Sequence, residues 1–465
     1  MTAARPLWTA EEIAAATDGT ANAEFAATGI TFDSREVGKG DLFVALTGQE
    51  TDGHRFLGGA YEYGAAGALV CVPTSYPSVF VDDTMPALEA LGRAARARAD
   101  AVVIGVTGSV GKTGTKEALA ACLARAHPGR VHWSVKSYNN HTGVPLSLAR
   151  MPADTRFGVF EMGMNHAGEM TALAQMVRPH IAVVTAIAPA HTAFFSGEEA
   201  IADAKGEIFT GLQPGGTAIV PFDSPHRDRL IAAARPHAGR IVTFGSGAGA
   251  DVRAIETMPV ASGGTFVSAR VHDRDLSFTL SQPGAHWVSN AMAVLAAVDA
   301  AGSDLGLAGL ALGDMAGLPG RGARFAARVA GGEALVIDES YNANPSSMRA
   351  TLAVLGAEKG RRLAVLGGMR ELGDDSDRYH AGLSRPIDEA GLSHVILVGD
   401  EMAALAEVLE GRMDFVHVPD AAAARDRLMA VLAPGDAVLV KGSNGIGLSA
   451  VVAALRDRHG AGVAD

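Results

Sequence analysis

The sequence is short of three things: cysteine, positive charge and long apolar runs. Its 465 residues include two cysteines, Cys71 and Cys122, each among apolar neighbours, so we expect buried packing residues rather than a thiolate metal cluster. The formal net charge is -12 and no basic stretch is present, which argues against a nucleic-acid partner. No apolar run approaches the length of a membrane span, and the first residues lack the order of a signal peptide. We therefore expect a cytoplasmic globular protein without membrane insertion.

Hydrophobic residues are plentiful, at 48% of the chain, and they occur in runs that alternate with helical patterns. A chain of this length predicts about three domains. We place them at residues 1–100, 101–319 and 320–465. The expected fold class is α/β: a small α/β amino-terminal domain, a central mostly parallel sheet of the phosphate-loop type with an added antiparallel hairpin, and a Rossmann-like carboxy-terminal domain.

The central region carries the clearest order of elements. The strand-like "AVVIGVTG" precedes a helical pattern over 112–126, and "FGVFEMG", "HIAVVTAI", "TAIVPF" and "RIVTFG" are further strand candidates. "GTFVSARVHDRDLSFTLSQPG" then alternates on both sides of a His-Asp-Arg-Asp turn, which predicts an antiparallel hairpin before a helix from 286 to about 301. In the last region, apolar runs such as "ALVIDES" and "HVILVGD" end in polar residues, where ligands of Rossmann-like sheets bind.

One stretch, "GVTGSVGKTGTKEAL", nearly matches a phosphate-binding loop. The common pattern G-x-x-x-x-G-K-[ST] would require glycine at Val106. The chemical parts of such a loop are nevertheless present: glycines that let backbone N–H groups point inward, a lysine for the terminal phosphates and a hydroxyl for Mg²⁺. The alternative is a surface glycine turn that caps a helix. The residues concerned are Gly108, Ser109, Gly111, Lys112 and Thr113.

Three further residues have two interpretations each. Glu161 ends the run "FGVFE", where it could reach a metal held by nucleotide phosphates or simply form a cap or an ion pair. His191, in apolar company, could be a ligand or a core histidine. Lys205 lies on the apolar stripe of a helical pattern over 201–212. Its ammonium could extend past the stripe to solvent, which the helix alone favours, or burial could leave a neutral amine able to form a carbamate with CO₂.

Several stretches together resemble the Mur ligases over almost the whole chain, and within that family the branch that adds a dipeptide. They are "TGSVGKT", "TFDSREVGKGDLFVALTGQETDGHRF", "YNNHTGVP", "EMGMNHAGE", "AKGEIF", "NAMAVLAA", "GLPGRGARF", "IDESYNANPSSM", "LGGMRELGDDSDRYH" and "KGSNGIGL". The first of these is the family's own form of the phosphate loop. The chain departs from the family at Gly114, often Ser or Thr, at Glu339, often Asp, and at Asn444, often Arg.

The resemblance implies roles for individual residues. Lys112, Glu161, His191 and Lys205 would be catalytic, and Thr113, Glu161, His191 and carbamylated Lys205 would hold Mg²⁺, with two metal sites expected. The implied nucleotide contacts are Gly108, Ser109, Gly111, Lys112, Thr113, Asn290, Arg321, Asp338, Tyr341 and Asn342. The implied contacts with the second substrate are Ser34, Arg35, Asn139, Asn140 and His166. The alternatives are a helix cap for Asp338 and a surface ion pair for Arg321.

The activity that this resemblance implies is ATP-dependent joining of D-alanyl-D-alanine to UDP-N-acetylmuramoyl-tripeptide through an acyl phosphate, by a monomer. Sister ligases that add the third amino acid usually have D-N-P-R in the last domain, which is absent here. Folylpolyglutamate synthases lack the UDP-sugar segment at 33–35, and two cysteines cannot form the four-cysteine module of related amidoligases. A regulator that binds the muropeptide without catalysis is the alternative from another class. Whether the third peptide residue is diaminopimelate or lysine stays open.

Overall fold

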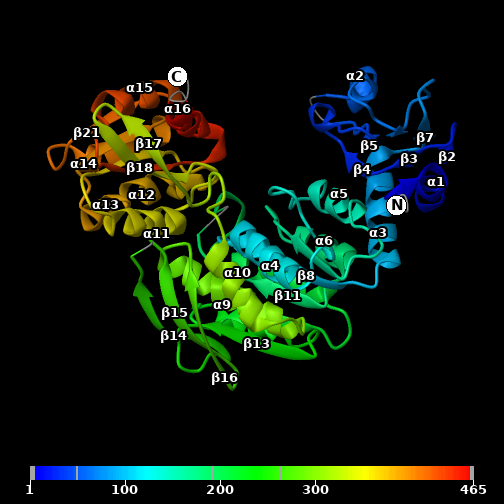
Figure 1. Cartoon of the computed structure of the whole chain (residues 1–465), viewed down its shortest axis with the longest axis horizontal. Coiled ribbons are helices and arrows are strands. Elements are labelled where there is room, and N and C mark those ends of the chain that lie inside the picture. Colours follow the sequence, from blue (N-terminus) through cyan, green and yellow to red (C-terminus); the bar gives the residue numbers. More distant parts are fainter. Residues whose placement is uncertain (1–5, 49–50, 190–191, 262, 461–465) are drawn as a thin grey trace.

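The computed structural model describes residues 6–48, 51–189, 192–261 and 263–460, and its sheets form the three bodies seen in Figure 1. The amino-terminal body has a five-stranded sheet in the order β2-β7-β6-β5-β4, parallel except for β2, and a small antiparallel β1-β3 pair. Its strands are β1 (Trp8–Thr9), β2 (Thr20–Ala21), β3 (Ala26–Ala27), β4 (Gly29–Thr31), β5 (Asp41–Val44), β6 (Gly67–Val70) and β7 (Ser78–Phe80). Its helices are α1 (Ala10–Thr17), α2 (Leu57–Glu62) and α3 (Thr84–Arg98).

The central body is built on a nine-stranded sheet in the order β16-β15-β14-β13-β12-β11-β8-β10-β9. Pairing is parallel from β9 to β14 and antiparallel through β14, β15 and β16. The strands are β8 (Val102–Thr107), β9 (Val131–Trp133), β10 (Phe157–Glu161), β11 (Ile181–Val184), β12 (Thr217–Pro221), β13 (Arg240–Gly245), β14 (Val252–Pro259), β15 (Thr265–Val271) and β16 (Arg274–Leu280).

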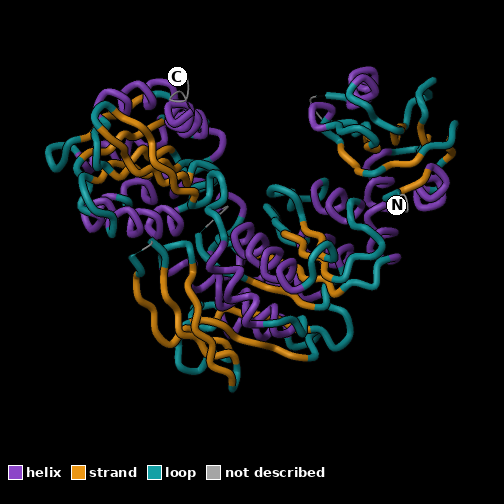
Figure 2. The backbone as a smooth tube through the Cα atoms, viewed as in Figure 1, coloured by secondary structure: helices purple, strands orange, loops and turns teal. Residues whose placement is uncertain are grey.

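Helices cover both faces of this sheet, as the ribbon and tube views show (Figures 1 and 2). One face packs on α4 (Lys112–Ala126), α9 (Ala285–Ala300) and α10 (Leu305–Asp314). The other packs on α5 (Gly143–Ala149), α6 (Glu169–Val177), α7 (Glu198–Gly206) and α8 (Arg227–Ala234). Burial from both sides explains why the parallel strands are continuous apolar runs instead of alternating ones.

The predicted hairpin is present, but its turn is shorter than expected. Only His272 and Asp273 lie between β15 and β16, because Arg274 and Asp275 already pair with Val271 and Arg270 across the ladder. His272 has a φ of 55°, which suits a two-residue hairpin turn. β14 adds a third strand to this antiparallel part, and the sequence pattern did not predict it.

The carboxy-terminal body has a six-stranded sheet in the order β17-β18-β22-β19-β20-β21, parallel apart from the β17-β18 hairpin. The strands are β17 (Ala323–Val329), β18 (Gly332–Glu339), β19 (Arg362–Gly367), β20 (His394–Val398), β21 (Phe415–Val418) and β22 (Ala437–Lys441). One face packs on α11 (Pro345–Gly356), α12 (Ser376–Ala381), α13 (Ser384–Ala390) and α14 (Ala403–Leu409), and the other on α15 (Ala421–Val431) and α16 (Ser449–Gly460). The predicted α/β fold class is confirmed.

The two cysteines differ in burial. Cys122 is buried as expected, whereas Cys71 follows β6 and is only partly buried, with its Sγ 3.6 Å from His54 Nε2. Within the described residues, no helix is both long enough and apolar enough to cross a bilayer.

Candidate active site

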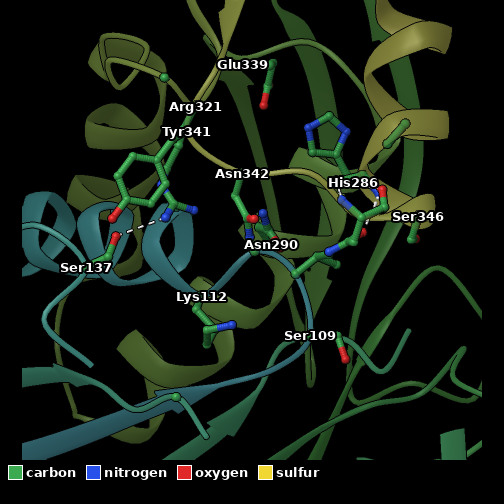
Figure 3. Close-up of a pocket in the computed structure, with 18 of the residues that line it drawn as sticks. Ser109, Lys112, Ser137, His286, Asn290, Arg321, Glu339, Tyr341, Asn342 and Ser346 are labelled. Atoms are coloured by element: carbon green, nitrogen blue, oxygen red, sulfur yellow. Dashed lines mark hydrogen bonds between the residues drawn. The ribbon is translucent and has the colours of Figure 1, made fainter. Parts of the chain in front are cut away.

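A cavity of about 400 Å³ lies where the central and carboxy-terminal bodies meet (Figure 3). The phosphate loop and Glu161 border it on the central side, and Arg321 and Tyr341 border it on the other. The loop, Glu161 and Tyr341 lie at or just beyond the end of a strand, and Arg321 lies just before β17 and close to Tyr341. Such edges are where open α/β sheets bind ligands.

The loop after β8 has the backbone that a phosphate cradle requires. Gly108 has a φ of 150°, and a Cβ there would lie 2.0 Å from Thr185 Oγ1, so only glycine fits. Gly111 has a φ of 84° directly before α4 begins at Lys112. The Lys112 ammonium donates to Gly108 O over 2.7 Å, and burial lowers its pKa, while the Glu161 carboxylate opposes that effect. The loop therefore places a helix N-terminus and a lysine at one wall of the cavity.

Glu161 is the most connected carboxylate at this wall. It ends β10, which pairs in parallel with β8, and it is 1% exposed. Its Oε2 accepts from Thr113 Oγ1 over 2.8 Å, and its Oε1 accepts from Asn139 Nδ2 over 2.7 Å. This group of one carboxylate, one hydroxyl and one amide offers oxygen atoms of the kind that Mg²⁺ prefers.

Lys205 is 1% exposed, so the interpretation in which its ammonium reaches solvent is wrong. The α-helix ends at Gly206 and continues as a 3₁₀ segment over 207–211, which differs from the single helix expected to 212. Burial and then the Lys112 ammonium lower the pKa of Lys205 well below its usual value, and no described carboxylate offsets them. The side chain is therefore a buried amine held toward its neutral form. His191 lies outside the described residues.

Helix α9 closes the cavity above the loop. A Cβ at Gly111 would meet Asn290 Oδ1 at 2.6 Å, and one at Gly114 would meet the Trp287 ring at 2.9 Å. The departure from Ser or Thr at Gly114 therefore has a steric reason, since it lets Trp287 pack on α4. His286 also lines the cavity, and burial, aided by Lys441, lowers its pKa to about 4.

On the carboxy-terminal side, Arg321 bridges the two bodies. Its Nη2 donates to Ser137 Oγ over 3.0 Å, drawn as a dashed line in Figure 3. Its guanidinium carbon lies 4.2 Å from the centre of the Tyr341 ring. Asn342 follows, and its carbonyl accepts from Lys441 Nζ over 2.8 Å. Arg321, Tyr341 and Asn342 thus lie together at the cavity, as the sequence led us to expect, although their roles remain predictions.

Asp338 does not line the cavity. Its Oδ2 accepts from Gly320 N over 2.8 Å, its Oδ1 accepts from Ser340 Oγ over 2.7 Å, and Arg456 lies 3.5 Å away. These contacts use the carboxylate to shape the loop beside Arg321. A contact with ribose stays a prediction that this arrangement does not favour.

The residues predicted to contact the second substrate do not lie together at the cavity. Asn139 reaches the cavity, whereas Asn140 Oδ1 accepts from Gly143 N, at the start of α5, over 2.9 Å. Ser34 and Arg35 lie after β4 in the amino-terminal body, where Arg35 forms a two-point pair with Asp33. His166 pairs with Glu169 over 3.0 Å near the Phe194 ring.

Sequence reasoning missed several cavity residues. Lys441 is 1% exposed and lies 3.6 Å from Glu339, which the sequence marked only as a departure from the family. Burial lowers the pKa of Lys441 and raises that of Glu339. A charged residue in an apolar strand, "AVLVK", was the available signal for Lys441. Ser137, His286 and Trp287 carried no comparable signal, because only the packing of distant segments brings them to the cavity.

Comparison with known proteins identifies the family. Three family models match: "Mur ligase family, catalytic domain" at residues 26–121, "Mur ligase middle domain" at 106–298 and "Mur ligase, glutamate ligase domain" at 320–444. The UDP-N-acetylmuramoyl-tripeptide--D-alanyl-D-alanine ligase of Escherichia coli is 33% identical over 92% of this chain and 93% of its own.

Solved structures support the same family assignment. MurF from Acinetobacter baumannii is 32% identical and superposes with a TM-score of 0.83, covering 97% of this chain and 99% of its own. MurF from Thermotoga maritima, solved in complex with ADP, is 26% identical with a TM-score of 0.77, covering 92% of this chain and 97% of its own. The chain belongs to the Mur ligase family.

Proposed function

We propose that this protein is an ATP-dependent, ADP-forming ligase that adds D-alanyl-D-alanine to UDP-N-acetylmuramoyl-tripeptide in peptidoglycan precursor synthesis. The observation that carries the proposal is one cavity in which Lys112 and Glu161 face Arg321 across two bodies. A phosphate loop opposite an arginine is suited to phosphoryl transfer, because both can stabilise charge on the transferring group. The similarity to ligases of that name over more than nine-tenths of the chain supplies the substrate class.

The nucleotide would bind along the phosphate loop. The N–H groups of Gly108, Ser109 and Gly111 would meet its phosphates, and Lys112 would neutralise the terminal ones. Asn290 lies against Gly111, where it would meet the base. Arg321 would contact a phosphate, with Tyr341 and Asn342 beside it.

The residues at Glu161 fit a divalent cation. Thr113 and Glu161 supply hard oxygen donors, and the buried Lys205 amine would become a further anionic ligand on reaction with CO₂. In that reaction the amine nitrogen bonds to the CO₂ carbon and releases one proton. His191 would complete the set of ligands for two cations. Bound Mg²⁺ would offset charge that builds up on the transferring phosphoryl group.

The chain's own residues would then act by position and charge. A carboxylate oxygen of the tripeptide attacks the γ-phosphorus of ATP. The bond between that phosphorus and the oxygen that leaves with ADP breaks at the same time. Lys112 and Arg321 would hold the phosphoryl group between the substrates. The dipeptide amine next attacks the acyl carbon, loses a proton, and phosphate leaves from the tetrahedral intermediate. No protein nucleophile is required.

Each of the three bodies would bind a different substrate. Residues 1–100 would hold the UDP-sugar near Ser34 and Arg35, 101–319 would hold ATP, and 320–465 would present the dipeptide. Asn139, Asn140 and His166 would face the muropeptide. We infer that the bodies close on binding, and small-angle scattering that shows no compaction with an ATP analogue and the UDP-tripeptide would contradict this. We propose a monomer that acts in the cytoplasm, where ATP is available.

The test is phosphate release with Mg-ATP and UDP-N-acetylmuramoyl-tripeptide, comparing D-alanyl-D-alanine with single amino acids. Release that requires the dipeptide, with a matching mass gain on the nucleotide sugar, is the expected result. Release with a free amino acid and UDP-dipeptide would assign the protein to the sister ligases, and tight binding without turnover would make it a regulator. The carbamate is tested separately by a ¹³C signal from labelled bicarbonate that Lys205→Ala abolishes.

A further inference from the structure

Lys116 is a buried lysine with no part in the proposed reaction. It lies one helical turn after Lys112 on α4, and its side chain is 0% exposed. A buried ammonium is costly unless its donors are all satisfied. Here they are: Nζ contacts Ser134 O at 2.7 Å, Lys136 O at 2.8 Å and Glu117 Oε1 at 2.6 Å. Such complete use of its donors in one place indicates a defined structural task.

Two of the three acceptors belong to a single turn, residues 134–136, which follows β9. Lys136 has a φ of 55°, a left-handed conformation that is unfavourable for residues other than glycine. The Lys116 ammonium on its carbonyl helps to hold that conformation. The Lys136 side chain in turn pairs with Glu36 of the amino-terminal body. Lys116 therefore holds the backbone of the turn, and the Lys136 side chain connects the turn to the amino-terminal body.

The segment around this turn reaches the site at three points. Ser134 Oγ accepts from Glu161 N over 3.3 Å, and Asn139 Nδ2 donates to Glu161 Oε1 over 2.7 Å. Ser137 Oγ accepts from Arg321 Nη2 over 3.0 Å. A shift of the turn would consequently move both the carboxylate of the central body and the arginine of the carboxy-terminal body.

We propose that Lys116 is a positioning residue, which fixes the segment 134–139 so that Glu161 and Arg321 lie correctly about the phosphate loop. The proposal rests on the ligase function proposed above. Lys116 itself touches neither substrate. Lys116 joins the nucleotide-binding helix to this segment through Ser134 and Lys136, and Thr113 Oγ1 of the same helix adds a longer contact of 3.4 Å with Ser137 Oγ.

The experiment replaces Lys116 with methionine, which keeps the length of the side chain and removes the donors. We expect kcat of the full-length ligase to fall about 100-fold, as small misplacements of reacting groups do, with KM for ATP nearly unchanged because the phosphate loop and Lys112 remain. In an Asn139→Ala background, Lys116→Met should lower kcat by a much smaller factor, because the hydrogen bond from Asn139 to Glu161 is already absent. Lys136→Met, which loses the side chain but keeps the carbonyl, is the matched control and should alter kcat by about twofold at most.

Several results would overturn the proposal. If the folded Lys116→Met protein has wild-type kcat, the turn does not position the site. The same conclusion follows if Lys116→Met lowers kcat by the same factor in the Asn139→Ala background as in the wild type. If the variant does not fold, Lys116→Gln, which keeps one N–H donor, replaces it and should give an intermediate kcat. Failure of both to fold would show that the ammonium serves the fold rather than the site. A wild-type protein without ligase activity would instead refute the proposed function.

Discussion

Thr113 donates a hydrogen bond from its Oγ1 to Glu161 Oε2 over 2.8 Å, which joins the first turn of α4 to the end of β10. The two residues are 48 positions apart in sequence, yet they meet because β8 and β10 are parallel neighbours whose carboxyl ends lie at one edge. The pair would share a divalent cation if the proposed function is correct.

The first prediction concerns this pair. Glu161→Gln should lower kcat about 100-fold and move the Mg²⁺ dependence to higher concentration, because an amide is a weaker ligand than a carboxylate. Phosphate release measured over a series of Mg²⁺ concentrations tests it. Glu389→Gln, which alters an exposed pair with Arg385, should leave both quantities unchanged. An unaltered Mg²⁺ dependence in Glu161→Gln would remove Glu161 from the metal site.

The second prediction concerns the glycine under Trp287. Gly114→Ala should lower the free energy of unfolding by about 1–3 kcal/mol, because the new Cβ meets the indole ring at 2.9 Å. Gly59→Ala in α2 is the control, since nothing lies within 4 Å of its Cβ position, and should be neutral or slightly stabilising. Urea denaturation measures both. Trp287→Leu combined with Gly114→Ala should be less destabilised than the sum of the single changes, and strict additivity would argue against the contact.

The third prediction concerns His132, whose Nε2 is 2.8 Å from Ser147 O. Burial lowers the pKa of this histidine to about 4, so the folded protein resists protonation that the unfolded chain accepts near its ordinary pKa of 6.5. The unfolded state then binds more protons at this site between pH 6.5 and 4, so the contribution of His132 to stability falls by about 3 kcal/mol as the pH falls through that window, and His286 adds to the same slope. Urea denaturation at a series of pH values tests this. His132→Gln should flatten the slope, and an unchanged slope would contradict the assignment.

The fourth prediction concerns Arg321. A lysine there cannot both donate to Ser137 and stack on Tyr341, so Arg321→Lys should lower kcat/KM for ATP about 10- to 100-fold. Steady-state kinetics with ATP as the varied substrate measure this. Arg385→Lys, at a side chain that is 86% exposed, is the control. Wild-type kinetics in Arg321→Lys would mean that the guanidinium serves only the contact between the bodies.

The three α/β bodies, the phosphate loop and the family were predictable from the sequence alone. These features depend on local pattern: continuous apolar runs predict doubly covered parallel strands, and glycines flanking a lysine after such a run predict the cradle. The hairpin was also visible in its alternation, although its turn length was not, because strand pairing decides how many residues leave the ladder.

Which residues share the cavity depends on the packing of the folded chain and was not predictable from the sequence. That packing buried Lys205, for which the helical stripe alone favoured an ammonium reaching solvent, and it turned Asp338 away to Gly320 and Ser340. It also brought Lys116 under the turn at 134–136. The physical reason is the same in each case: burial and hydrogen-bond partners are set by segments distant in sequence, and no local periodicity records them.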